Sequence, residues 1–126
     1  MTRRRATLSL IGLGLGLAWT ARAQALPSTR MQTEVEHLLG AIEASGCSFY
    51  RNGSWHDAKA AQAHLRSKYD YLRGLGQLAS AEQFIDKAAT QSSFSGQAYR
   101  VRCGDAKEMP SHDWMYARLA QFRAAP

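Results

Sequence analysis

Basic and hydroxyl side chains recur at spacings that could build a binding site for an anion. His64 and Lys68 are four positions apart, so on a helix their side chains would share one face. Arg51 precedes an Asn-Gly pair, and a serine-rich segment with many hydroxyl groups covers residues 90–97. Basic groups supply charge to an anion, hydroxyls supply directional hydrogen bonds, and glycine lets the backbone approach a ligand. We therefore predict an anion-binding cleft formed by Arg51, His64, Lys68, Ser92, Ser93 and Ser95.

Two other interpretations of these residues stay open. In the first, the helix face is simply solvated, and the serine hydroxyls hydrogen-bond to nearby backbone groups. In the second, Ser93 or Ser95 attacks a substrate while His64 acts as its base. Asp57 or Glu43 would then orient the imidazole. Because the sequence lacks the Gly-x-Ser-x-Gly pattern, we expect a non-enzymatic protein without a catalytic residue, with a small hydrolase as the alternative.

The four histidines are too scattered to predict a metal site. None of them lies at ligand spacing from another histidine or from a cysteine. The closely spaced glycines of residues 12–16 belong to an N-terminal leader rather than to a phosphate-binding loop. We therefore expect no metal and no cofactor. Trp55 and Trp114 could line a sugar or peptide groove, although burial is the more frequent fate of tryptophan in a small core.

The N-terminal residues have the order of a secretory signal peptide. Three arginines at 3–5 are followed by an apolar stretch at 8–19 and by Ala-Arg-Ala at 21–23. This sequence of a positive region, an apolar region and a small-residue cleavage site is typical of export signals. The apolar stretch is shorter than the roughly 20 residues of a membrane span. These residues therefore predict export to the periplasm or secretion.

Export divides the chain of 126 residues into two parts. We predict that residues 1–23 are a cleavable signal peptide, with cleavage after Ala23 or Ala25, and that residues 24–126 form one small domain. Removing the four arginines of the leader leaves 12 basic and 10 acidic residues, a net charge of +2. This charge gives no electrostatic footprint for nucleic acid, so we expect no nucleic-acid partner. From the predicted compartment alone, we expect a cell-envelope protein or a small ligand as partner. We also expect no membrane span after cleavage.

Cys47 and Cys103 are the two cysteines of the chain. In an oxidising compartment an even pair predicts one disulfide, Cys47–Cys103, and a free or catalytic thiol is the alternative. The bridge would close a loop of about 57 residues and stabilise the fold by roughly 4 kcal/mol. The sequence has no Cys-x-x-Cys spacing to indicate a redox pair.

Hydrophobic periodicity predicts four helices. Three of them cover residues 31–45, 58–73 and 112–123, and a shorter one follows Ser80. Asp57, Ser80 and Ser111 are suited to cap the last three helices at their N-termini.

A small sheet is predicted from turn chemistry and alternation. Asn52-Gly53 between two runs that contain aromatic residues predicts a hairpin in which Tyr50 faces Trp55. Residues 98–103 alternate as a third strand, and residues 104–110 indicate a loop. We therefore predict an α+β fold of about four helices packed on a three-stranded antiparallel sheet.

Four runs of residues are distinctive when taken together. They are Glu43-x-Ser45-x-Cys47-x-Phe49-x-Arg51-Asn52-Gly53, Ala60-x-x-x-His64-Leu65-x-x-Lys68-Tyr69, Phe84-Ile85, and Ser92-Ser93-x-Ser95-Gly96-x-x-Tyr99. As a set they resemble the YfeK-like family of small secreted bacterial proteins, domain-of-unknown-function family 5329. The similarity covers residues 31–123. It implies an exported protein, and it implies no activity and no catalytic residues.

Overall fold

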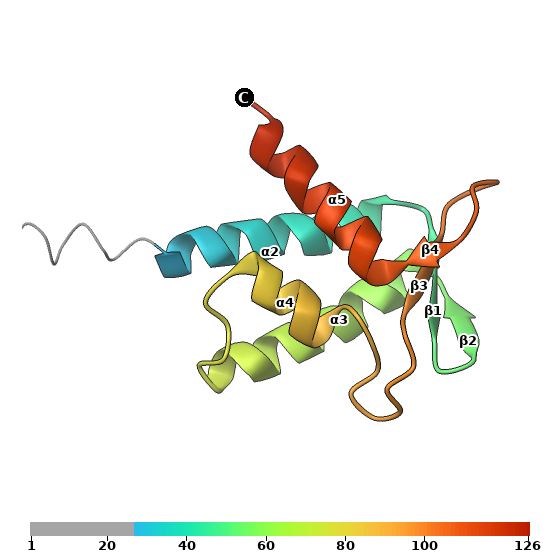
Figure 1. The fold of residues 1–126 in the computed structure, drawn as a ribbon, viewed down its shortest axis with the longest axis horizontal. Helices are drawn as coiled ribbons and strands as arrows, with labels where there is room; N and C mark the ends of the chain where they lie inside the picture. Colours follow the sequence, from blue (N-terminus) through green and yellow to red (C-terminus); the bar gives the residue numbers. More distant parts are fainter. Residues whose placement is uncertain (1–26) are drawn as a thin grey trace, which may run out of the picture.

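Helices and a small sheet form two sides of one core (Figure 1). The computed structural model describes residues 27–126, so the predicted signal peptide, residues 1–23, lies outside the described part. In chain order the elements are α2 (Pro27–Ala44), β1 (Ser48–Arg51), β2 (Ser54–His56), α3 (Ala58–Gly74), α4 (Ala81–Ala88), β3 (Arg100–Arg102), β4 (Met109–Pro110) and α5 (Ser111–Ala124). The predicted α+β class is confirmed, with four helices in the described part. None of these helices is both long and apolar enough to cross a membrane.

The sheet has four strands in the order β2-β1-β3-β4, and the prediction of three strands was wrong. The added strand, β4, is two residues long and pairs Met109 with Val101. So short a segment ending in proline has no alternating pattern, and it becomes a strand because β3 offers it a hydrogen-bonding edge. The strand predicted at 98–103 is shorter than expected, at Arg100–Arg102.

The hairpin has the predicted register. Tyr50 pairs with Trp55, and Phe49 pairs with His56. At the turn Asn52 has φ +50° and Gly53 has φ +91°. A two-residue type I′ turn needs positive φ at both positions, which asparagine and glycine tolerate better than other residues. The local sequence therefore determines this part of the sheet.

One face of the sheet is buried against the helices. Phe49 of β1 and Val101 of β3 are paired and almost fully buried. The Phe49 ring meets Trp114 of α5 edge-on, with 5.8 Å between ring centroids. Trp114 is therefore part of the core, whereas Trp55 lies half-buried on the opposite face, beside Tyr50. The sequence alone left open which face would be buried.

The predicted disulfide Cys47–Cys103 is confirmed. It joins the residue before β1 to the residue after β3. These strands are neighbours, and Ser48 pairs with Arg102, so the bridge closes the end of the strand pair. Such a bond is consistent with a protein that folds outside the cytoplasm.

Two of the three predicted helix caps are present. The Asp57 carboxylate accepts a hydrogen bond from the Ala60 N–H at 2.8 Å, and the Ser80 hydroxyl accepts one from the Gln83 N–H at 3.1 Å. The prediction that Ser111 caps α5 was wrong, because Ser111 is the first residue of this helix and is buried. Its backbone N–H donates to the Tyr99 carbonyl at 2.9 Å, which holds the start of α5 against the sheet.

The C-terminal end of α5 is held by a single arginine. The Arg123 guanidinium donates to both carboxylate oxygens of Glu34 on α2, at 2.7 and 2.8 Å. It also donates to both oxygens of Glu82 on α4, at 2.8 and 3.1 Å. Glu34 is only 5% exposed. Arg123 therefore neutralises a buried carboxylate and joins three helices.

Candidate functional site

A cleft of about 530 Å³ lies between α3, the hairpin tip and the loop that connects α4 to β3. The hairpin turn and the loop at residues 91–97 extend toward the same end of the molecule (Figure 1). Five of the six predicted site residues line this cleft, namely Arg51, His64, Lys68, Ser92 and Ser93. Ser95 is outside the lining, and its hydroxyl donates to the side-chain oxygen of Asn52, which is part of the lining. The fold thus gathers residues from three separate segments.

Asn52 connects two walls of the cleft. Its side-chain nitrogen donates to the Ser92 hydroxyl oxygen at 3.2 Å, while its side-chain oxygen accepts from Ser95. The Ser92 oxygen also accepts from the backbone N–H groups of Phe94 and Ser95, each at 3.1 Å. This serine therefore closes its own loop, as one of the open interpretations held, and at the same time anchors that loop to the hairpin.

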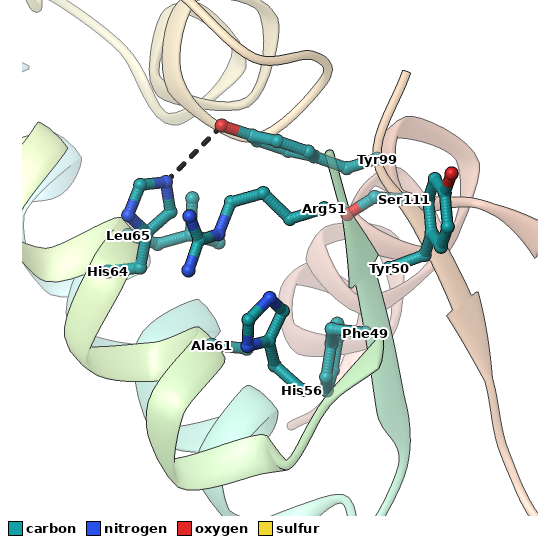
Figure 2. Close-up of a pocket in the computed structure, with 9 residues that line it drawn as sticks. All are labelled: Phe49, Tyr50, Arg51, His56, Ala61, His64, Leu65, Tyr99 and Ser111. Carbon is teal, nitrogen blue, oxygen red and sulfur yellow. Dashed lines mark hydrogen bonds between the residues drawn. The ribbon is translucent and has the colours of Figure 1, made fainter. Parts of the chain in front are cut away.

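The polar centre of the cleft is the hydroxyl of Tyr99. The Lys68 Nζ donates to this oxygen at 3.1 Å. The His64 Nε2 lies 3.3 Å from the same oxygen, a contact that Figure 2 shows as a dashed line. Lys68 also donates to the Gln91 carbonyl at 3.3 Å. The sequence placed Tyr99 on the predicted third strand but did not select it as a site residue. Its side chain is buried, and its hydroxyl reaches two candidate residues on α3.

Arg51 approaches the same centre from the sheet. Figure 2 shows its side chain extending from β1 toward His64, with His56 on the other side. These residues border a second hollow of about 20 Å³, which has room for about one water molecule. Arg51, His64 and Tyr99 line both hollows. The smaller hollow is therefore an extension of the same site toward the sheet.

The cleft carries positive charge that no carboxylate offsets. Arg51, Lys68 and Lys87 line it, and none of the lining residues is acidic. The salt bridges within residues 27–126 include none of these three cations. By contrast, Arg66 and Arg100 have glutamate partners at 2.6 and 2.8 Å. An anion in the cleft would meet basic groups that are not already neutralised.

The ionisable groups of the cleft respond to burial and to one another. Burial lowers the pKa of His64, and the charges of Arg51 and Lys68 lower this pKa further. Burial also lowers the pKa of Lys68, again with a contribution from Arg51, and burial raises the pKa of Tyr99. His64 and Lys68 thus hold their protons less tightly than usual. A bound anion would oppose this effect by favouring their protonated forms.

The rim of the cleft contains large side chains that sequence reasoning missed. Phe94 and Tyr71 line it and are 96% and 68% exposed. Lys87 of α4 also lines it and was not selected. The position of Phe94 inside the serine-rich segment was the available signal, whereas Tyr71 and Lys87 enter the site only through tertiary packing.

The arrangement does not supply the nucleophilic pair of the hydrolase alternative. The hydrogen bonds of residues 27–126 give His64 one partner, the Tyr99 hydroxyl, and none joins it to a serine. Ser95 donates to Asn52, and Asp57 accepts the capping bond of α3. A serine nucleophile needs a base within hydrogen-bond reach, and the hydrogen bonds of the described residues do not form such a pair with His64.

Comparisons with known proteins point to one family, whose function is unknown. The family described as "Family of unknown function (DUF5329)" matches residues 29–123. A protein named "Uncharacterized protein YfeK" from Salmonella typhimurium is 34% identical over 86 residues, which cover 68% of this chain and 70% of that protein. No solved structure matches the chain. The family match includes every residue that lines the cleft.

Proposed function

Because the chain belongs to the DUF5329 family of unknown function, as its sequence predicted, we propose a function from its geometry: an exported, non-enzymatic module that binds an anionic ligand. The observation that supports this proposal is the set of three cations, Arg51, Lys68 and Lys87, that lines one cleft without a carboxylate. Charge-assisted hydrogen bonds from such groups are roughly twice as strong as neutral ones.

Each polar group has a role in this proposal. Arg51 offers a planar fork of N–H donors that suits two oxygens of one anion, while Lys68 offers a point charge. The Tyr99 hydroxyl lies within reach of Lys68 and positions its ammonium group. Ser93 lines the cleft and provides a further hydroxyl donor. His64 adds charge when the ligand favours its protonated form.

The position of Lys68 favours this proposal over a merely solvated helix face. Its side chain is only partly exposed, and its Nζ donates to both Tyr99 and Gln91. A lysine on an open surface keeps its full hydration and its rotamer freedom. Ordering it before the ligand arrives reduces the entropy that binding must remove.

The export part of the proposal is supported by the leader-like residues 1–23 and by the Cys47–Cys103 disulfide. The partner would then be a small ligand or a protein of the cell envelope. Protein recovered from the periplasm should begin at Gln24 or Leu26, with both cysteines resistant to alkylation. Recovery with Met1 retained and two reactive thiols would contradict export.

Calorimetry with sulfate tests the binding part on the purified, oxidised protein. We expect saturable binding that weakens by roughly tenfold in Lys68→Met and in Arg51→Gln, since each substitution removes one charged donor. Lys107→Met is the matched control, because Lys107 is exposed, lies outside the cleft and carries the same charge. Melting temperatures identify any variant that has lost its fold. Absence of saturable binding, or an equal loss in Lys107→Met, would contradict the proposal.

A further inference from the structure

We infer from the rim of the cleft that its ligand is an organic anion, in which an acidic group is carried on an apolar or aromatic body. This inference rests on the proposed anion-binding function and names the chemical class of ligand. The inference comes from the apolar side chains Tyr71 and Phe94, whereas the proposed function rests on the cations of the cleft.

Exposed apolar side chains are concentrated at this site. The large hydrophobic residues exposed within residues 27–126 are Tyr71, Leu75 and Phe94. Tyr71 and Phe94 line the cleft, and Leu75 follows Tyr71 by four positions at the end of α3. Single exposed apolar residues are common on protein surfaces, but a group of them marks a place where something binds.

The loop presents Phe94 outward in a defined turn. The backbone N–H groups of Phe94 and Ser95 donate to the Ser92 hydroxyl, and the Gly96 N–H donates to the Ser92 carbonyl at 2.9 Å. Gly96 has φ +78°, a conformation that glycine adopts without strain. Asn52 then anchors this turn to the hairpin. The ring is therefore held in solvent by the turn, at 96% exposure.

Charge and apolar surface occupy different parts of the cleft. Lys68, His64 and Tyr99 form the hydrogen-bonded polar centre. Phe94 from the loop and Tyr71 from α3 provide apolar surface that is open to solvent. A bare inorganic ion would leave that surface unused, and a neutral apolar ligand would leave the cations without a partner.

The size of the cleft fits a small molecule. Its volume of about 530 Å³ falls within the roughly 300–1,000 Å³ of pockets that enclose small ligands. An acidic group at Lys68 would leave the remaining volume for an apolar body beside Phe94. Charge complementarity and shape therefore both favour an organic anion.

Two sulfonates with the same head group test the inference. Naphthalene-2-sulfonate and methanesulfonate carry the same single charge, and only the first has a large apolar body. By calorimetry we expect naphthalene-2-sulfonate to bind about tenfold more tightly or better, because its rings bury apolar surface against the rim. Uncharged 2-naphthylmethanol should bind more weakly than naphthalene-2-sulfonate.

Variants at Phe94 separate the contribution of the apolar body to the affinity from that of the acidic group. Phe94→Ser should remove most of the difference between the sulfonates while leaving the affinity for methanesulfonate unchanged. Phe94→Leu should keep most of the difference, because it retains an apolar side chain. Both variants should keep the melting temperature, since the side chain is almost fully exposed.

The outcomes distinguish this inference from the function on which it rests. If neither sulfonate binds saturably, the anion-binding function fails together with the inference. If both bind with equal affinity, or if Phe94→Ser weakens both equally, the inference fails and the anion site stands. Equal affinities combined with Phe94-dependent binding to phosphatidylglycerol vesicles would place Phe94 in a membrane surface and overturn the inference as well.

Discussion

The side-chain nitrogen of Asn52 lies 3.2 Å from the hydroxyl oxygen of Ser92, forty positions further along the chain. This contact joins the tip of the hairpin to the loop that carries the exposed Phe94. The hairpin forms from its own turn chemistry, whereas the loop has a serine that closes it locally. The shape of the cleft therefore depends on one asparagine that links two local structures.

Asn52→Gly should loosen the cleft without distorting the hairpin, because glycine tolerates the observed φ of +50°. We expect the free energy of unfolding to fall by about 1 kcal/mol and sulfate binding to weaken. Hydrogen exchange at the Phe94 and Ser95 amides should become faster. Ser54→Gly is the matched control, since Ser54 is an exposed hairpin residue. Unchanged exchange in Asn52→Gly would show that the loop holds its shape alone.

The affinity for methanesulfonate should rise as the pH falls through the pKa of His64. Burial and the charges of Arg51 and Lys68 lower this pKa, so at neutral pH the imidazole is mainly uncharged. Protonation adds a positive charge to the cleft, and the charge of methanesulfonate is constant between pH 5 and 8. Calorimetry across this range should show the dependence, and His64→Gln should remove it.

Stability should follow the opposite trend, because the pKa of His64 is lower in the folded state than in the unfolded chain. The unfolded state therefore binds more protons once the pH falls below about 6.5, and this destabilises the fold.

The control for the pH-dependent affinity is His37→Gln, since His37 stacks on Phe122 outside the cleft. Loss of the pH-dependent affinity in His37→Gln, or its persistence in His64→Gln, would contradict the assignment.

Arg123→Met should lower the free energy of unfolding by roughly 2–3 kcal/mol at pH 7, because it removes the main partner of a buried carboxylate. Glu34 is 5% exposed, and the hydrogen bonds from Arg123 lower its pKa. In the wild type this stabilisation is present above about pH 4.5 and is lost as the pH falls through the lowered pKa. Urea denaturation at several pH values measures both effects.

A matched control for Arg123 is Arg66→Met, which breaks an ion pair with Glu36 between two substantially exposed side chains. Exposed pairs contribute about 0.2–1 kcal/mol, so the loss should be clearly smaller. Equal losses in the two variants would show that burial of Glu34 does not determine the strength of its pair.

Replacing both cysteines with alanine should lower the free energy of unfolding by roughly 4 kcal/mol, the value expected from the entropy of the closed loop. Cys47 and Cys103 are separated by 56 positions, so the bridge restricts a large part of the unfolded chain. Urea denaturation of the oxidised, the reduced and the doubly substituted protein should place the last two together. A reduced protein as stable as the oxidised one would contradict this account.

Local chemistry explains what the sequence predicted well. Asn52-Gly53 determines the hairpin register, and Asp57 and Ser80 cap their helices, because each acts on groups within a few positions. Where the prediction was wrong, a distant contact decides the structure. The start of α5 is held by the Tyr99 carbonyl rather than by a Ser111 cap, and β4 forms on the edge of β3.

The same distinction applies to the cleft. Helical spacing was enough to select His64 and Lys68, and the position beside the Asn-Gly turn was enough to select Arg51. The fold brings these three residues together. The Tyr99 hydroxyl was missed because its contact with Lys68 spans 31 positions. Phe94 was missed because its exposure depends on how the loop is anchored, and no periodic pattern reports such an arrangement.

An NMR titration of the oxidised protein with naphthalene-2-sulfonate would locate the bound ligand on the protein. We expect saturable shifts of backbone amides at the hairpin tip, along α3 from His64 to Leu72, and in the loop around Phe94. Lys68→Met should weaken the binding that these shifts report, whereas Lys107→Met should leave it unchanged. Shifts that map to another face, or that never saturate, would contradict the claim that this cleft is a binding site for an organic anion.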